Sequence, residues 1–310
     1  MSLLAWLKKK GPNGFGYGST AADVTAGLDL HGRTMLVTGC GSGLGLETVR
    51  TLAARGARVI ATARTADKAR QACAELTGDF LPLACELSEP ASVRACVEAV
   101  KRNGAPLDAL ICNAGIMALP QLRQAHGCEL QFFTNHVGHF MLVIGLLERL
   151  APAGRVVVVA SNAHRRAPAA GIEFDNLSGQ RGYEPWKAYG QSKLANILFA
   201  SELARRLGGG AAAVARTANS LHPGVIATNL SRDIPAPARA ALRMAAPILL
   251  KSVAQGAATQ CYLATNPAVA GVTGAYFSDC RPVQPTAPAR DAALAARLWE
   301  ESERIVARLP

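Results

Sequence analysis

An apolar stretch followed by a run of glycines constrains the fold of this chain more than any other feature. Residues 34–38 (Thr-Met-Leu-Val-Thr) predict a buried strand, and Gly39-Cys-Gly-Ser-Gly-Leu-Gly45 follows directly. A helix-forming segment then runs to Arg55, and Gly56 is a typical helix stop. This order is typical of a dinucleotide-binding unit, in which backbone amides approach a pyrophosphate at a helix N-terminus. The spacing is Gly-x-x-x-Gly-x-Gly, not the commoner Gly-x-Gly-x-x-Gly.

Predicted strands and helices alternate along the rest of the chain without a long break. The further strands are expected at residues 58–63, 80–84, 107–112, 155–161, 213–221 and 272–277, with a long apolar helix at about 129–150. Such alternation predicts an α/β fold: a single doubly wound, Rossmann-type domain with a seven-stranded parallel sheet and helices on both faces. We expect this domain to span residues 31–310, after an N-terminal extension of residues 1–30.

The end of the second predicted strand bears on the choice of dinucleotide. Units that bind NAD keep an acidic residue there for the ribose hydroxyls, whereas this chain has Ala63 followed by Arg64. A missing acid removes repulsion toward a 2′-phosphate, and a guanidinium can bind that phosphate in a fork. The pattern favours NADP(H) over NAD(H). The alternative is a solvated arginine that opens the next helix.

A second helical segment carries a candidate acid/base pair. Tyr189 and Lys193 are four residues apart in a segment that ends near Arg205 and Arg206, before Gly208. Residues i and i+4 lie on one face of a helix, so the ammonium is expected to lower the pKa of the phenol by about 1–3 units. Taken alone, Tyr-x-x-x-Lys is more often a solvated helix face.

Composition narrows the class of protein. Half of the 310 residues are hydrophobic and 18% are charged, so a large core can be buried. The net charge of +11 favours anionic partners, but the basic residues are scattered and few aromatics lie among them, which argues against nucleic-acid binding. Eight cysteines without a Cys-x-x-Cys indicate free thiols in a reducing cytoplasm. The histidine pair His136 and His139 lacks a third ligand nearby, so we expect no metal.

The first ten residues are a candidate membrane contact. Met1–Leu7 is apolar and three lysines follow, which is too short for a membrane span and the reverse of a secretory signal. Such an amphipathic element can rest on an anionic bilayer. The alternatives are a frayed terminus or a segment packed on the domain.

Six elements, taken in order, resemble the short-chain dehydrogenase/reductase family over roughly residues 30–280. They are Thr38-Gly-x-x-x-Gly-x-Gly45, Asn113-Ala-Gly115, Asn135, Ser161, Tyr189-x-x-x-Lys193 and Pro223-Gly224. Further segments are similar to the retinol-dehydrogenase-like branch, which includes the WW-domain-containing oxidoreductase and chloroplast Tic32-type proteins. These segments are Gly18–Thr25, Asn135–Phe140, Ser192–Leu198 and Phe277–Cys280.

The resemblance implies a role for each matching catalytic residue. Tyr189 would be the general acid/base, and Ser161 would hydrogen-bond the reacting oxygen. Lys193 would lower the pKa of Tyr189, hold the nicotinamide ribose and lead protons toward a water near Asn135. Asn135 taken by itself is more simply a satisfied polar core residue, and Ser161 a cap at a strand end.

The resemblance also implies the residues that contact the cofactor. Thr228 would hold the nicotinamide carboxamide, and Asn113 would line the adenine side. The full set is Gly39, Ser42, Gly43, Leu44, Gly45, Arg64, Glu86, Leu87, Asn113, Ala114, Gly115, Tyr189, Lys193, Pro223, Gly224, Val225 and Thr228. Two positions depart from the family pattern: Cys112 replaces the first asparagine of Asn-Asn-Ala-Gly, and Glu86 replaces an aspartate that commonly contacts adenine.

These observations predict an NADP(H)-dependent oxidoreductase that transfers a hydride between the nicotinamide and a carbonyl or alcohol carbon. Residues 225–255 are apolar and interrupted by prolines. They are expected to cover an apolar, retinoid-, lipid- or steroid-like substrate. The alternative is that this face packs on another subunit of a homo-oligomer. A different class of function also stays open, that of an NADP(H)-sensing regulatory or scaffold protein.

Overall fold

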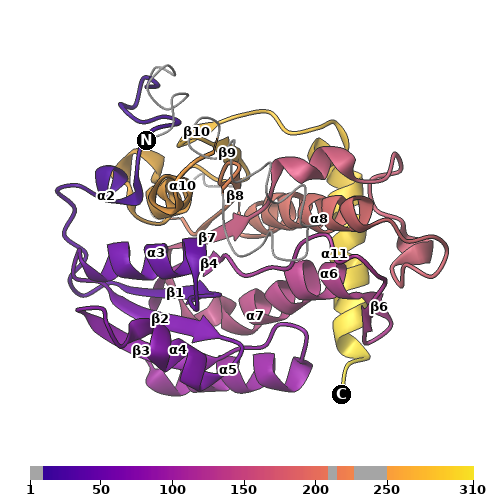
Figure 1. The fold of residues 1–310 in the computed structure, drawn as a ribbon, viewed down its shortest axis with the longest axis horizontal. Helices are drawn as coiled ribbons and strands as arrows, with labels where there is room; N and C mark the ends of the chain where they lie inside the picture. The colour runs from indigo at the N-terminus through magenta and orange to yellow at the C-terminus, as the bar shows by residue number, and fades with distance from the viewer. Residues whose placement is uncertain (1–9, 209–214, 227–249) are drawn as a thin grey trace.

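The computed structural model describes residues 10–208, 215–226 and 250–310, and an eight-stranded sheet forms its centre (Figure 1). The strand order is β10-β9-β8-β7-β4-β1-β2-β3. Neighbouring strands are parallel except for β10, which is antiparallel to β9. The strands are β1 (Thr34–Thr38), β2 (Arg58–Ala63), β3 (Asp79–Ala84), β4 (Leu107–Cys112), β7 (Leu150–Val159), β8 (Thr217–His222), β9 (Tyr276–Ser278) and β10 (Arg281–Pro282). A separate pair, β5 (Gln124–Ala125) and β6 (Cys128–Glu129), forms a small hairpin.

The predicted doubly wound α/β fold is confirmed, but the prediction of seven strands was one short. The additional strand, β10, is only two residues long. It follows a tight turn in which Asp279 and Cys280 have positive φ angles. A two-residue strand carries no alternation of apolar and polar residues, so no sequence pattern announces it.

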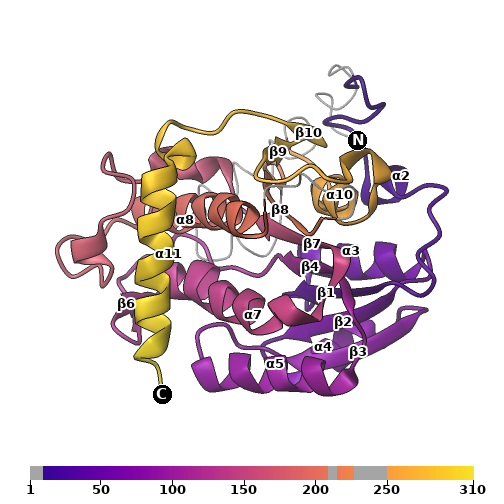
Figure 2. The same cartoon turned by 180° about the vertical axis from the view of Figure 1, so that it is seen from behind.

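Helices cover both faces of the sheet. On one face α3 packs against β1 and β2, and α10 packs against β4, β7 and β8. The helices α5, α7 and α8 pack on the other face (Figure 1). The C-terminal helix α11 lies across α8 (Figure 2). The α-helices are α2 (Ala21–Val24), α3 (Gly43–Ala53), α4 (Ala66–Cys73), α5 (Pro90–Asn103), α6 (Leu130–Phe132), α7 (Gly138–Leu146), α8 (Pro185–Arg206), α10 (Val253–Thr265) and α11 (Ala292–Ala307).

The predicted apolar helix is a continuous helical segment, Leu130–Arg149, with a π-helical turn at Phe133–Val137 between α6 and α7. The segment is long and apolar enough to cross a membrane, but 78% of its most apolar part is buried inside this domain. It therefore has the surroundings of a core helix. The π-turn is of interest because such turns free backbone groups and are frequent at functional sites.

The N-terminal segment packs against α10, which lies near the other end of the chain. Residues of α2 pack against α10, and Phe15 contacts Tyr262 ring to ring at 5.6 Å. Both views show the N-terminal segment beside α10 (Figures 1 and 2). The expected membrane contact of residues 1–10 lies almost wholly outside the described residues. All eight cysteines are free and buried.

Candidate active site

The helix α8 carries the candidate acid/base pair. It begins at Pro185, and the side chain of Glu184 caps it by accepting hydrogen bonds from the amides of Trp186 and Lys187. Tyr189 and Lys193 follow one turn apart, with exposed fractions of 5% and 3%. Both side chains are therefore buried inside the domain, not displayed on a solvated helix face.

Ser161 meets Tyr189 at the carboxyl end of β7. The Ser161 hydroxyl accepts a hydrogen bond from the Ala163 amide at 3.1 Å, which caps a short 3-10 turn. It also hydrogen-bonds the Tyr189 side chain. Gly190 permits this approach, because a Cβ there would lie 2.7 Å from the Ala163 carbonyl oxygen. The two hydroxyls that the sequence places 28 residues apart are thus direct partners.

The expectation that Lys193 lowers the pKa of Tyr189 is not met. Burial raises the pKa of Tyr189 to about 12, and the hydrogen bond from Ser161 offsets only part of this. The Lys193 ammonium donates to the Val159 carbonyl at 3.0 Å and lies 5.7 Å from the centroid of the phenol ring. Burial lowers the pKa of Lys193 itself to about 8. Desolvation is the largest cause of both pKa shifts because both groups lie in the dry interior.

Asn135 lies in the π-turn and has its side chain fully engaged. Its Oδ1 accepts from the Ile116 amide at 2.8 Å. Its Nδ2 donates to the Ile116 carbonyl and to the Ser192 hydroxyl, each at 2.9 Å. Gly115 lies so close that a Cβ there would be 2.9 Å from Oδ1. The side chain therefore ties the chain after β4 to α8, as a satisfied polar core residue does.

His139 is a residue at this site that the sequence did not reveal. Its Nδ1 lies 2.9 Å from the Asn135 carbonyl, which can only accept, so Nδ1 carries the proton. Burial lowers the pKa of His139 to about 4, so the ring is neutral and Nε2 accepts from the Thr38 hydroxyl at 2.9 Å. That hydroxyl also accepts from the amides of Asn113 and Ala114. One histidine thus connects the π-turn to the end of β1.

The sequence presents His139 with His136 as a possible metal pair, but in the structure the two rings have different partners. His136 donates to the Ser302 hydroxyl through Nε2 at 2.7 Å, and its Nδ1 has no partner. A histidine four residues after Asn135 on one helix face is the signal that was available.

The glycine turn after β1 is shaped for close approach. Gly39 and Gly43 have φ angles of +74° and +59°. A Cβ on Gly45 would lie 2.2 Å from the Gly39 carbonyl oxygen, and one on Gly41 would meet open space. Ser42, the N-cap of α3, makes no side-chain capping bond, so the first amides of α3 are not covered by it. This geometry fits a dinucleotide phosphate.

Asn113 joins that turn to α10. Its Nδ2 donates to the Thr38 carbonyl at 2.8 Å, and its Oδ1 accepts from Gln260 at 3.2 Å. Gln260 also donates to the Thr48 hydroxyl on α3. The amide of Asn113 is therefore fixed from both sides, beside Leu44 at the start of α3.

Two of the residues expected on the adenine side of the cofactor, Arg64 and Glu86, are more exposed to solvent than Tyr189 and Lys193. Arg64 is exposed directly after β2, and within the described part of the chain no carboxylate pairs with it. Glu86 is half-buried and accepts from the Ser88 hydroxyl at 3.0 Å. Leu87 is buried, and its carbonyl lies where a Cβ on Gly138 would be only 2.3 Å away.

The Pro-Gly segment follows β8. Pro223 is buried, Gly224 has a φ of +101°, and the carbonyl of Val225 accepts from the Lys251 amide at 3.0 Å. Thr228 lies outside the described residues, as does most of the expected substrate cover at 225–255.

The fold and the converging side chains define an oxidoreductase-type dinucleotide domain, and comparison with known proteins gives the family. Residues 33–238 match the short chain dehydrogenase family, and the chain belongs to the short-chain dehydrogenase/reductase family. It is 41% identical to short-chain dehydrogenase TIC 32 B, chloroplastic, of Brassica napus, over 97% of each chain. It is 38% identical to retinol dehydrogenase 14 of Homo sapiens, over 90% of this chain and 88% of that one.

A solved structure agrees with these relatives. The crystal structure of an uncharacterized protein from Mycobacterium paratuberculosis matches with a TM-score of 0.74 and 36% identity, over 94% of this chain and 98% of that chain. The family and the branch predicted from the sequence are confirmed.

Proposed function

We propose that the protein is an NADP(H)-dependent oxidoreductase acting on the carbonyl or alcohol carbon of an apolar, retinoid-, lipid- or steroid-like substrate. The observation that carries this proposal is the hydrogen-bonded pair Ser161 and Tyr189, one helical turn from the buried Lys193. The nicotinamide supplies or accepts the hydride. The protein's own residues handle the proton and the charge on oxygen.

Negative charge develops on the carbonyl oxygen during reduction, and hydroxyl donors aimed at that oxygen stabilise it. Ser161 and Tyr189 are the two donors in this assignment. A phenol with a pKa of about 12 keeps its proton at neutral pH, which suits a proton donor. Lys193, with a pKa of about 8, is protonated at neutral pH and stabilises the phenolate that remains after transfer.

The cofactor assignment follows the residues around the glycine turn. Gly39, Gly43 and Gly45 leave room for the pyrophosphate at the N-terminus of α3. Arg64, exposed at the end of β2, would bind the 2′-phosphate of NADP(H). Pro223–Val225 and Thr228 would lie on the nicotinamide side, as the family resemblance implies.

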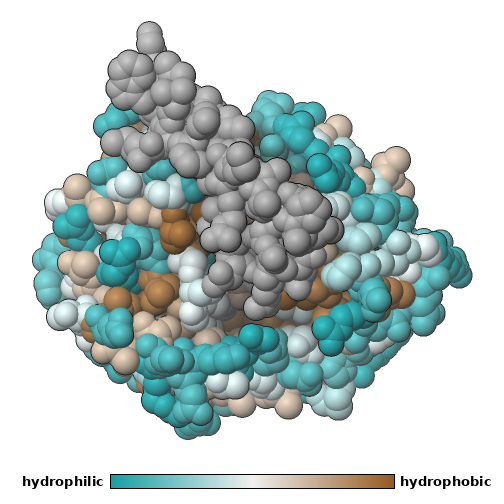
Figure 3. All heavy atoms as spheres, viewed as in Figure 1, coloured by the Kyte–Doolittle hydropathy of each residue, from teal (hydrophilic) through white to brown (hydrophobic). Residues whose placement is uncertain are grey.

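An apolar substrate is supported by two observations. Val225 is 56% exposed, and no other large hydrophobic side chain of the described segments is exposed. On the face drawn in Figure 3, brown hydrophobic patches lie beside the grey atoms within a surface that is otherwise mostly hydrophilic. A relative of 38% identity is named as a retinol dehydrogenase. A cytoplasmic location, membrane contact through residues 1–10 and a homo-oligomer stay predictions.

The test is a panel of apolar aldehydes and ketones assayed with NADPH and with NADH. We expect turnover of at least one class of apolar carbonyl compound, faster with NADPH. Faster turnover with NADH would overturn the role given to Arg64. Tight NADPH binding without turnover of any member would favour a regulatory sensor instead.

A further inference from the structure

We propose that the buried ion pair of Lys251 and Asp279 positions the segment Pro223–Ile226, and through it the nicotinamide half of the cofactor. The inference rests on the proposed function, which places this segment on the nicotinamide side. It concerns positioning residues, since nothing here requires either charge to touch the cofactor.

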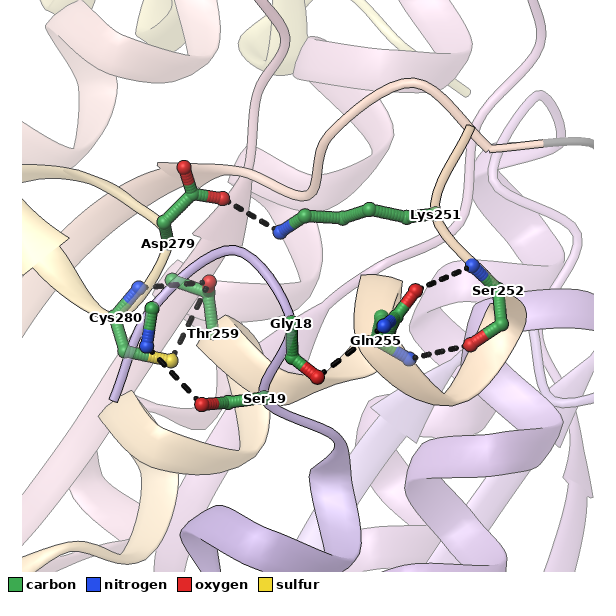
Figure 4. Close-up of polar contacts among 9 residues, drawn as sticks. Gly18, Ser19, Lys251, Ser252, Gln255, Thr259, Asp279 and Cys280 are labelled. Carbon is green, nitrogen blue, oxygen red and sulfur yellow. Dashed lines mark hydrogen bonds and ion pairs between the residues drawn. The ribbon is translucent and has the colours of Figure 1, made fainter. Parts of the chain in front are cut away.

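The pair is close and enclosed. Lys251 Nζ lies 2.6 Å from Asp279 Oδ1, and the two side chains have exposed fractions of 1% and 13%. The ammonium also lies 4.9 Å from the centroid of the Tyr17 ring. Figure 4 shows the two side chains extending toward one another from different segments. A buried ion pair adds little stability over a well-packed apolar pair, so its presence calls for a reason other than stability.

Lys251 holds the Pro223–Ile226 segment in two ways. Its backbone amide donates to the Val225 carbonyl at 3.0 Å, and it pairs with Ile226 in a parallel bridge. Its side chain crosses Gly224, where an added Cβ would lie 2.6 Å from Lys251 Cδ. The aliphatic stem therefore packs directly on the Pro-Gly backbone, and the ion pair at its tip fixes where that stem lies.

Asp279 is itself rigidly held. Asp279 and Cys280 have φ angles of +53° and +60°, which non-glycine residues adopt only when their surroundings enforce it. The Cys280 amide donates to the Thr259 hydroxyl on α10 at 3.2 Å, and its carbonyl accepts from Asn13 at 2.7 Å. These bonds aim the carboxylate at Lys251.

The same helix also anchors the N-terminal segment that brings Tyr17. Ser252 and Gln255 form a reciprocal cap at the start of α10. The Gln255 side chain then donates to the Gly18 carbonyl at 3.2 Å (Figure 4). Lys251 thus contacts three segments that are far apart in the sequence, those of Tyr17, Asp279 and Pro223–Ile226. This convergence is what a positioning role requires.

The experiment compares the affinity for NADPH with that for adenosine 2′,5′-bisphosphate, a fragment without the nicotinamide half. Both are measured by fluorescence or calorimetry on Lys251→Met and Asp279→Asn. We expect NADPH to bind about tenfold more weakly, because the contacts between the displaced Pro223–Ile226 segment and the nicotinamide half would be weakened. Binding of the bisphosphate should change by less than about twofold. Lys251→Arg, which keeps the charge, should restore part of the NADPH affinity.

Lys187→Met is the control, because it breaks an ion pair of similar length on another element: Lys187 of α8 pairs with Glu173 at 2.7 Å and is more exposed. It should change neither affinity. Equal weakening of both ligands in Lys251→Met, or no weakening, overturns the positioning role. If Lys251→Met does not fold, Asp279→Asn decides, since asparagine tolerates a positive φ. Wild-type protein that binds neither NADPH nor NADH refutes the proposed function itself.

Discussion

The catalytic end and the adenine edge of the proposed cofactor site differ in how far their charged and titratable side chains are exposed to solvent. At the catalytic end, Tyr189 and Lys193 are almost fully buried, and protein groups supply their hydrogen bonds. At the adenine edge, Arg64 is exposed, and no partner for it occurs among the residues described. The catalytic end is thus dry: its side chains are shielded from water and held by protein groups. The adenine edge is wet: its arginine is in contact with solvent.

The difference teaches where each kind of selectivity resides. Burial shifts the pKa values of both Tyr189 and Lys193, so the proposed chemical step would depend on groups that water does not screen. An exposed guanidinium is screened by solvent and salt, so its contribution is moderate and falls with ionic strength. Changes at the catalytic end should therefore affect turnover, and changes at the edge should affect the choice of cofactor.

The largest effect is expected for Tyr189→Phe. Removing the hydroxyl should lower kcat by about 10²- to 10⁴-fold, because the proton donor is lost, while NADPH affinity stays within a few-fold. Steady-state kinetics and a binding titration measure the two quantities. Tyr183→Phe is the control, since burial also raises the pKa of that tyrosine to about 12 but its hydroxyl donates to the Leu119 carbonyl. Turnover that survives in Tyr189→Phe would remove the catalytic half of the comparison.

The next effect concerns the wet edge. Arg64→Ala should weaken NADPH binding by about 10- to 100-fold and leave NADH nearly unchanged, because charge-assisted bonds to a phosphate are lost. The loss should shrink at high salt. Arg70→Ala serves as the control, since that exposed arginine already pairs with Asp67 on α4. Equal losses for both dinucleotides would show that Arg64 does not read the 2′-phosphate.

The fold was predictable because its signals are local. The strand, glycine turn and helix at 34–56 are contiguous, and so is the spacing of Tyr189 and Lys193. The strand β10 escaped prediction because two residues carry no period. The family resemblance paired Ser161 with Tyr189, and the structure places Ser161 just after β7, hydrogen-bonded to Tyr189 of α8.

The raised pKa of Tyr189 escaped prediction for a different reason. An i, i+4 spacing shows that an ammonium is near, but not that both groups are enclosed by segments from elsewhere in the chain. His139 escaped in the same way, because its partner Thr38 is 101 residues away. Hydrophobic periodicity reports only on residues that are close in sequence, so burial and long-range polar pairing could be seen only in the structure.

A smaller effect is expected on stability, from two neighbouring histidines. His139→Phe leaves the Thr38 hydroxyl and the Asn135 carbonyl without their buried partner, so it should lower the free energy of unfolding by about 1–3 kcal/mol. His136→Phe removes one bond to Ser302 and also an unpaired nitrogen, so its loss should be smaller. Chemical denaturation measures both. A larger loss for His136→Phe would contradict the link between the π-turn and β1.

The smallest effect is a pH dependence that belongs to the dry end alone. Lys193 has a pKa of about 8, so it is charged below that pH and loses its charge above it. Reduction of a carbonyl needs the ammonium to stabilise the phenolate, so kcat should fall by about fourfold between pH 7 and 8.5, as the charged fraction does. His139 cannot produce this limb, since burial lowers its pKa to about 4.

Lys193→Arg separates this explanation from others, because arginine stays charged to above about pH 12. The falling limb should move out of the measurable range, even if the bulkier side chain lowers the maximum rate. NADPH binding to the adenine edge should show no such limb in either protein. A limb near pH 8 that persists in Lys193→Arg would assign the titration to another group and leave the charge of Lys193 without a role in the proton step.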